Sequence, residues 1–259
     1  MSVGRTVSPA GSMRLGTLAG IELRVHLLFV LWVGLHLVES ADLLGALVFD
    51  VILFGSVLLH ELGHCLAARL VGGQALAIVL YPFGGASLLR TPRTPGAELI
   101  STGAGPLVNL VLAVVAVAAA AALGVLGAAL DHPGAAFGLG SGAGQQADRL
   151  ANLVFSAALV NAALFAFNVI PAYPMDGGRL LRAALWPLLG WRRATVATTV
   201  LALLLAAACA ALAALFGELY LLLVALFVGV ASWSELQRAL AASDQPPTGD
   251  PSGALLPPP

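Results

Sequence analysis

Two histidines and a glutamate stand close together within an apolar stretch of the chain. The segment reads His60-Glu61-Leu62-Gly63-His64. Positions i and i+4 share one face of a helix, so both imidazoles can bind a single metal ion while Glu61 stands beside it as a base. The alternative is a pair of buried histidines with Glu61 as their counterion. Because leaving these three groups without a function inside a membrane is costly, the pattern favours a zinc hydrolase.

A catalytic zinc ion usually has three protein ligands and one open position for water. A second polar segment, residues 168–179, begins with Asn168 and contains Asp176. Pro171 and Pro174 break the helix there, and irregular backbone is tolerated at membrane depth only where it is buried in protein or lines a water-filled cavity. Asp176 is therefore the candidate third ligand. The alternative is an ordinary Asp-Gly turn in which Asp176 pairs with Arg179.

The composition of the chain indicates a membrane protein. Of its 259 residues, 59% are apolar and 10% are charged, and the mean hydropathy is +0.96. An ordinary soluble domain carries about 25% charged residues, so that class is excluded. A formal net charge of −1 excludes the strongly basic surface that binds nucleic acid. Cys65 and Cys209 lie in separate apolar runs, which excludes a disulfide framework and a cysteine zinc cluster.

The apolar runs predict an all-α polytopic membrane protein with six transmembrane helices, because each crossing needs about 20 mostly apolar residues. The predicted spans cover residues 21–38, 43–71, 99–130 and 150–170, and two more divide the run 194–240 near Gly217. We expect residues 1–20 to form a cytoplasmic tail, residues 21–240 to form the six-helix membrane core, and residues 241–259 to form a disordered, Pro-rich cytoplasmic tail.

The arginines predict how the chain is oriented in the cell membrane. The chain has no lysine, and with six spans every arginine except Arg149 falls on the same side. Positive charge beside the spans stays in the cytoplasm, so both termini are expected there. At 1.5 Å per residue, His60 lies about 26 Å along its helix from Leu43, and Asn168 lies about 27 Å from Leu150. The two polar segments are therefore expected at one level, toward the cytoplasmic face.

A short segment after the second span has the features of a β-hairpin or re-entrant loop. Ile78, Val79 and Tyr81 favour a strand, and Gly84-Gly85 favours a turn. The edge of such a hairpin, spanning residues 75–89, could pair with an extended substrate. The alternative is a structured connector with no role in binding.

Together these motifs resemble the site-two protease family of intramembrane zinc metalloproteases, over roughly residues 16–240. The resemblance rests on His60-Glu61-Leu62-Gly63-His64, Asn168-x-x-Pro171-x-x-Pro174-Met-Asp176-Gly177, Tyr81-Pro-Phe-Gly84-Gly85-Ala86 and Gly105-Pro106-Leu-Val-Asn109. It implies one zinc ion per chain, bound by His60, His64 and Asp176. It also implies that Glu61 is the general base and that Asn168 holds the substrate carbonyl, although Asn168 could instead make a hydrogen bond between helices. Asn109 is expected to pack against its neighbours.

These features predict a hydrolase that cuts peptide bonds in or near the transmembrane segments of membrane-protein substrates. The resemblance implies a role in regulated intramembrane proteolysis, in a compact form without an added PDZ or CBS domain. Zinc would make a hydroxide available at neutral pH, and Glu61 would accept the proton. The alternative is a metal transporter that uses the helix broken at Pro171 and Pro174. The partners expected are a membrane-embedded peptide and the lipid bilayer, with no nucleic acid.

Overall fold

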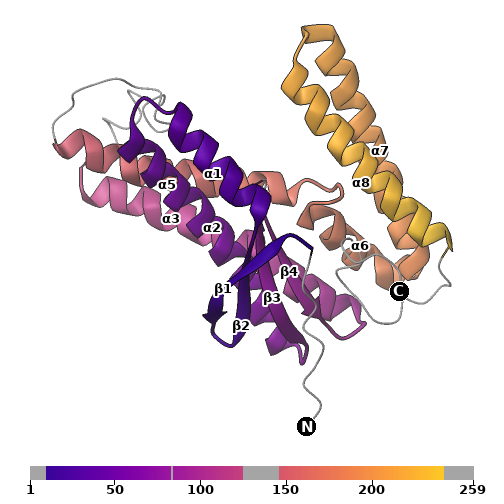
Figure 1. Ribbon diagram of the computed structural model, residues 1–259. Coiled ribbons are helices and arrows are strands. Elements are labelled where there is room, and N and C mark those ends of the chain that lie inside the picture. Colours follow the sequence, from indigo (N-terminus) through magenta and orange to yellow (C-terminus); the bar gives the residue numbers. More distant parts are fainter. Residues whose placement is uncertain (1–9, 83, 125–145, 242–259) are drawn as a thin grey trace.

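The chain folds into long apolar helices joined to one small β-sheet (Figure 1). The computed structural model describes residues 10–82, 84–124 and 146–241. Within these ranges, five helices are long and apolar enough to cross a membrane. They are α2 (Leu43–Leu70), α3 (Pro95–Ala122), α5 (Gln146–Val169), α7 (Trp191–Phe216) and α8 (Leu219–Ala241). The prediction of a polytopic membrane protein is confirmed.

The predicted count of six spans is not matched, because the first predicted span contains two different elements. Residues Ile21–His26 form strand β2, and only Leu27–Glu39 form helix α1. A helix of 13 residues is about 20 Å long, which is short of a bilayer core of about 30 Å. The segment before α1 alternates apolar and polar residues, and its buried side chains Ile21 and Val25 lie on the face that packs into the fold. Pairing with a distant strand therefore decides its conformation.

The four strands form one sheet, so the fold is not purely α-helical. The strands are β1 (Ser12–Leu18), β2 (Ile21–His26), β3 (Gln74–Tyr81) and β4 (Gly84–Arg90), in the order β1-β2-β3-β4. Strands β3 and β4 form the expected hairpin, while β2 pairs with β3 in parallel and with β1 in antiparallel orientation. Strand β1 lies within the range that the sequence assigned to a tail. The predicted C-terminal tail lies outside the described residues.

The sheet packs against the part of α2 that carries the histidine motif. Ile78 and Leu80 of β3 form one apolar cluster with Cys65 and Ala68 of α2. Cys65 is fully buried there, as expected of a packing residue. Burial of these side chains fixes the sheet against the helix and brings β4 beside Glu61.

A short helix that was not predicted, α6 (Asp176–Leu189), begins at the candidate third ligand. Its first turn passes very close to the end of α5. A Cβ atom at Gly177 would lie 2.2 Å from the carbonyl oxygen of Ile170, and one at Gly178 would lie 2.8 Å from the carbonyl carbon of Ala172. Only glycine permits this approach, so the Asp-Gly-Gly sequence sets where α6 begins.

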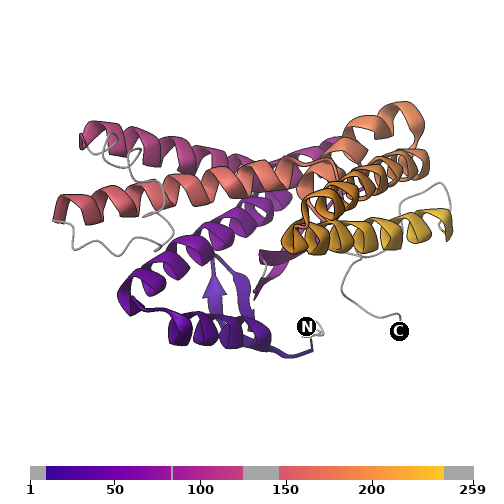
Figure 2. The same ribbon diagram turned by 90° about the horizontal axis from the view of Figure 1, so that it is seen from above.

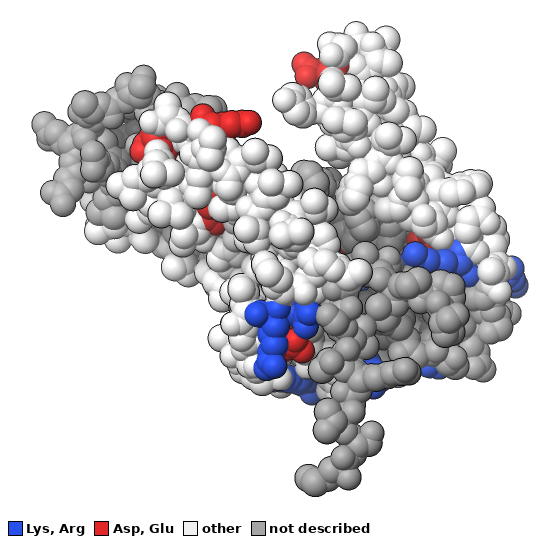
Figure 3. All heavy atoms as spheres, in the orientation of Figure 1, with Lys and Arg blue, Asp and Glu red and all other residues white. Residues whose placement is uncertain are grey.

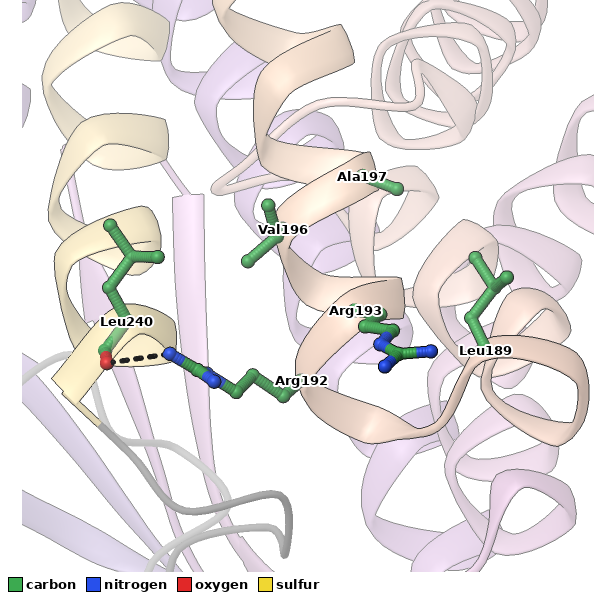
Figure 4. Close-up of a pocket in the computed structure, with 6 residues that line it drawn as sticks. All are labelled: Leu189, Arg192, Arg193, Val196, Ala197 and Leu240. Carbon is green, nitrogen blue, oxygen red and sulfur yellow. Dashed lines mark hydrogen bonds between the residues drawn. The ribbon is translucent and has the colours of Figure 1, made fainter.

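The helices form two groups, which Figure 2 shows from above. Helices α2, α3 and α5 pack against one another, while α7 and α8 form a hairpin that joins the first group through α6. In Figure 1 this hairpin diverges from the first group. Arg192, in the first turn of α7, closes the hairpin by donating hydrogen bonds to the carbonyl oxygens of Ala239 and Leu240 in α8, each at 3.2 Å. Figure 4 shows the hydrogen bond from Arg192 to Leu240 at the edge of a pocket of about 500 Å³ that the candidate metal ligands do not line.

Candidate metal centre

Three side chains from two distant segments meet at one point. The Nε2 atoms of His60 and His64 each lie 3.1 Å from Oδ2 of Asp176, and they lie 3.1 Å from each other. All three residues are buried. A tetrahedral zinc ion about 2.0 Å from each of three ligand atoms holds those atoms about 3.3 Å apart. The ligand triangle therefore has the size that a zinc ion requires.

The hydrogen bonds around the two imidazoles leave their Nε2 atoms available for a metal ion. Nδ1 of His60 lies 2.5 Å from Oδ1 of Asn109, and Nδ1 of His64 lies 2.8 Å from the carbonyl oxygen of Ser101. Both Nδ1 atoms must donate, because both partners are acceptors. In the neutral imidazoles, the Nε2 lone pairs then point at Asp176. This arrangement is typical of metal-bound histidines.

Asp176 completes the site as an anion. Its Oδ2 atom is buried and accepts no hydrogen bond from the residues that the structure describes. Burial raises the pKa of this carboxyl group, but His64 and His60, in their protonated forms, outweigh that effect and hold the pKa well below its ordinary range. A buried ionised oxygen needs a positive charge beside it, so the space between this oxygen and the two imidazole nitrogens suits a cation better than a neutral ligand. The three residues thus suit a bound zinc ion.

Helix α3 leaves space for an ion in front of the two imidazoles. A Cβ atom at Gly105 would lie 2.3 Å from Nε2 of His64 and 2.7 Å from Nε2 of His60. Gly63 permits the same close packing from the side of α2, because a Cβ atom there would lie 3.0 Å from the carbonyl oxygen of Ala104. The absence of a side chain at Gly105 therefore preserves the metal position.

A chain of buried amides supports His60, and the sequence did not predict it. Asn109 donates from Nδ2 to Oδ1 of Asn161 at 2.9 Å, and Asn161 donates to Oγ of Ser56 at 2.9 Å. These residues come from α3, α5 and α2, and Asn109 is completely buried. Asn109 was expected only to pack, but it orients a candidate ligand. The signal that could have revealed it is an amide in the middle of an apolar span, where a polar group needs a partner.

Glu61 lies against strand β4 rather than among the three candidate ligands. Its carboxylate accepts a hydrogen bond from the Oγ atom of Ser87, and the same hydroxyl lies 3.1 Å from the main-chain oxygen of Glu61. A Cβ atom at Gly85 would lie 2.4 Å from Cγ of Glu61. Strand β4 thus holds the candidate base Glu61. This residue follows His60 directly in the sequence, but its side chain contacts the sheet.

Asn168 does not reach the three ligands through a hydrogen bond. Its side chain is half-buried, and Nδ2 donates at 2.9 Å to the carbonyl oxygen of Leu164, one turn earlier in α5. Among the residues that the structure describes, Asn168 also makes no hydrogen bond to another helix, the alternative considered for it. Its part in catalysis stays a prediction.

Comparison with known proteins identifies the family. A family model described as peptidase family M50 matches residues 48–212, which include all three candidate ligands and Glu61. The chain belongs to peptidase family M50. The solved structure of a site-2 protease from Methanocaldococcus jannaschii is similar to this M50 chain, with a TM-score of 0.60 and 29% sequence identity over 87% of this chain and 95% of that one. The resemblance inferred from the motifs is confirmed.

Curated M50 relatives carry names that refer to zinc. A zinc metalloprotease of M. jannaschii is 31% identical over 84% of this chain and 58% of its own length. A putative zinc metalloprotease of Synechocystis sp. is 31% identical over 69% of this chain and 45% of its own. The putative zinc metalloprotease Rip3 of Mycobacterium tuberculosis is 32% identical over 66% and 43%. The chain thus spans about half the length of the curated relatives it matches. The family implies zinc as the metal.

Proposed function

We propose that this protein is an intramembrane zinc metalloprotease that cuts peptide bonds within or near the transmembrane segments of other proteins. The observation that carries the proposal is the buried triangle of His60, His64 and Asp176, with edges of 3.1 Å, in a chain of peptidase family M50. Glu61 follows His60 directly, so the base and the two histidine ligands arise from neighbouring positions of α2, while Asp176 comes from α6. The comparisons give no support to the alternative of a metal transporter.

In peptide hydrolysis, the bound metal and the residues around it would have different roles. Held by His60, His64 and Asp176, a zinc ion would act as a Lewis acid that makes a water molecule more acidic and polarises a peptide carbonyl. Glu61 would accept the proton of the attacking water and pass it to the leaving nitrogen. Ser87 would hold the Glu61 carboxylate in place between these two transfers. Asn168 would turn its amide from Leu164 toward the substrate carbonyl and stabilise the developing negative charge.

The position of β4 supports a substrate that binds in an extended form. Strand β4 is the last strand of the sheet, and its outer edge bears no other strand among residues 10–82, 84–124 and 146–241. Gly85 and Ser87 on this strand contact Glu61. A transmembrane helix hides its carbonyl groups in its own hydrogen bonds, so it must unwind before cleavage. Pairing with the edge of β4 would replace those hydrogen bonds beside the base.

The distribution of charge supports an orientation with both termini in the cytoplasm. In Figure 3 the arginine side chains lie at one end of the molecule, near the sheet and near the start of α7 and the end of α8, with a few acidic side chains beside them; acidic side chains also occur at the opposite ends of the helices. Positive charge marks the cytoplasmic face of a multi-pass protein. The metal site would then lie near the inner face of the cell membrane, where the enzyme would release membrane-bound proteins by regulated intramembrane proteolysis.

Cleavage in a defined membrane tests the proposal. Zinc-loaded protein is reconstituted in liposomes with single-pass peptides, and the wild-type chain is compared with Glu61→Gln and Asp176→Ala. We expect Glu61→Gln to abolish cleavage while keeping one zinc ion per chain, and Asp176→Ala to lose both cleavage and zinc. Glu218→Gln, at an exposed acidic residue between α7 and α8, is the matched control and should cleave normally.

Two results would contradict the proposal. Equal cleavage by wild type, Glu61→Gln and Asp176→Ala would show that the metal site does not carry the activity. Zinc uptake into the liposomes that persists in Glu61→Gln, without any peptide cleavage by the wild type, would instead favour the transporter.

A further inference from the structure

A buried arginine ties the helix that carries Asp176 to its neighbours. Arg182 lies six residues after Asp176 in α6, about 9 Å along the helix axis. Its Nε atom donates to Oε1 of Glu98 in α3 at 3.0 Å, and a second guanidinium nitrogen contacts the same oxygen. Its third nitrogen donates to Oε1 of Glu235 in α8 at 3.1 Å. The side chains of Arg182 and Glu98 are each 10% exposed, so this is an ion pair inside the fold.

Two aromatic rings also lie beside the guanidinium group of Arg182. It lies over the ring of Tyr173 at 5.8 Å and over the ring of Trp191 at 5.6 Å. Tyr173 precedes α6 and Trp191 begins the next helix, so the arginine contacts a residue on each side of the short helix. Contacts of this kind favour arginine over lysine, because the guanidinium group offers several donors in fixed directions and can reach both carboxylates while lying over the rings.

The partner of Arg182 stands on the turn of α3 that also orients a candidate ligand. The carbonyl oxygen of Ser101 lies 2.8 Å from Nδ1 of His64, and the hydroxyl of Ser101 donates to the main-chain oxygen of Glu98 at 3.3 Å. One turn of α3 therefore contacts His64 from α2 and Arg182 from α6. It links the two helices whose side chains must meet at the metal ion.

Stability alone does not account for an ion pair in this place. Replacing a buried ion pair by apolar residues of similar size is often neutral or stabilising, because the desolvation of two charges offsets their attraction. Apolar contacts do not depend strongly on direction. In contrast, two carboxylates and two rings hold the guanidinium group in one orientation. The pair thus suits a role in setting the position of α6.

We propose that Arg182 is a positioning residue whose ion pair with Glu98 holds Asp176 at the metal site. The inference rests on the proposed binding of zinc by His60, His64 and Asp176, and it goes beyond that function by naming what holds the third ligand in place. Gly177 and Gly178 allow the first turn of α6 to approach α5, and Arg182 then fixes the helix against α3 and α8.

The test measures zinc binding by the full chain in detergent, without any substrate. The dissociation constant is obtained by competition with a chromophoric chelator, and the cobalt-substituted protein reports the ligand set by its visible spectrum. We expect Arg182→Gln to bind zinc about 10- to 100-fold more weakly, as is typical when a supporting group is removed. Its cobalt spectrum should shift toward that of Asp176→Asn.

The chain offers a matched control on the same helix. Arg179 lies three residues before Arg182 and makes no hydrogen bond or ion pair with residues that the structure describes. Arg179→Gln removes the same charge, and both its zinc affinity and its cobalt spectrum should equal those of the wild type. Arg182→Lys keeps the positive charge but loses the several guanidinium donors. Its zinc affinity should therefore fall between those of Arg179→Gln and Arg182→Gln.

The outcomes separate positioning from general support of the fold. The inference would be overturned if Arg182→Gln kept the zinc affinity and the cobalt spectrum of the wild type and showed only a lower unfolding temperature. It would also be overturned if Arg179→Gln lost as much zinc affinity as Arg182→Gln. If Arg182→Gln does not fold, Arg182→Lys decides: an unchanged affinity and spectrum would overturn the inference. Because no peptide is involved, a wild-type chain that binds zinc but cleaves nothing would contradict the proposed function and leave the affinity comparison valid.

Discussion

Oδ1 of Asn109 accepts a hydrogen bond from Nδ1 of His60 across the interface between α3 and α2, at 2.5 Å. The contact joins residues 49 positions apart and fixes which nitrogen of the imidazole faces Asp176. We expect Asn109→Ala to weaken zinc binding about 10- to 100-fold, because the ring loses the acceptor that orients it. Chelator competition measures the change.

Asn161 provides a graded comparison for this prediction. It contacts Asn109 rather than the imidazole, so Asn161→Ala should weaken zinc binding less than Asn109→Ala does. A larger loss in Asn161→Ala would show that the amide chain supports the helix packing and not the ligand.

Gly105 faces the position of the metal ion, so a methyl group there should exclude zinc. In Gly105→Ala the new Cβ atom would lie 2.3 Å from Nε2 of His64, well inside contact distance. We expect the purified variant to fold and to contain almost no zinc. Gly103→Ala is the matched control on the same helix, because its Cβ atom would meet only Cδ2 of Leu180 at 3.6 Å. Metal analysis that finds equal zinc in both variants would refute the prediction.

Ser87 holds the carboxylate of Glu61, so its hydroxyl should affect turnover and not metal binding. We expect Ser87→Ala to keep one zinc ion per chain and to lower kcat about tenfold, because loss of one hydrogen bond to a charged group costs about 1.5 kcal/mol. Ser87→Thr keeps a hydroxyl and should retain most of the activity. Kinetics in liposomes give kcat, and loss of zinc from Ser87→Ala would argue against this assignment.

Glu98 neutralises the buried charge of Arg182, so removing it should destabilise the fold. We expect Glu98→Leu to lower the free energy of unfolding by about 3–5 kcal/mol, which is typical when a buried charge loses its partner. Arg238 belongs to the same network but is 49% exposed, and Arg238→Gln should change the free energy by at most about 1 kcal/mol. Thermal unfolding of the metal-free protein in detergent compares the two, and equal shifts would contradict the prediction.

The meeting of the three candidate metal ligands could be predicted from the sequence, because it depends on local rules. The spacing of His60 and His64 puts both on one helical face, and the rise per residue put Asn168 at the same depth. Asp176 follows the broken end of that helix, and its carboxylate does lie 3.1 Å from both imidazoles. The long apolar runs likewise determined that the chain crosses a membrane more than once.

The first predicted span was wrong because hydropathy does not distinguish a buried strand from the start of a helix. Residues 21–26 directly precede the apolar run of α1 and include three apolar residues, but they pair with β3, whose sequence lies about 50 residues further on. Ile21 and Val25 are buried through that pairing. The period-two alternation of the segment was the available signal for a strand.

The amino-acid sequence by itself determined which side chains are candidate metal ligands, since helix periodicity and the rise per residue are properties of short stretches of chain. Only the tertiary structure decided what supports them: Asn109 behind His60, Ser87 beside Glu61, and Gly105 in front of the imidazoles. Each of these contacts joins elements that are far apart in the chain. The physical reason is that their formation depends on how close the packed helices and the sheet approach one another, which no local pattern specifies.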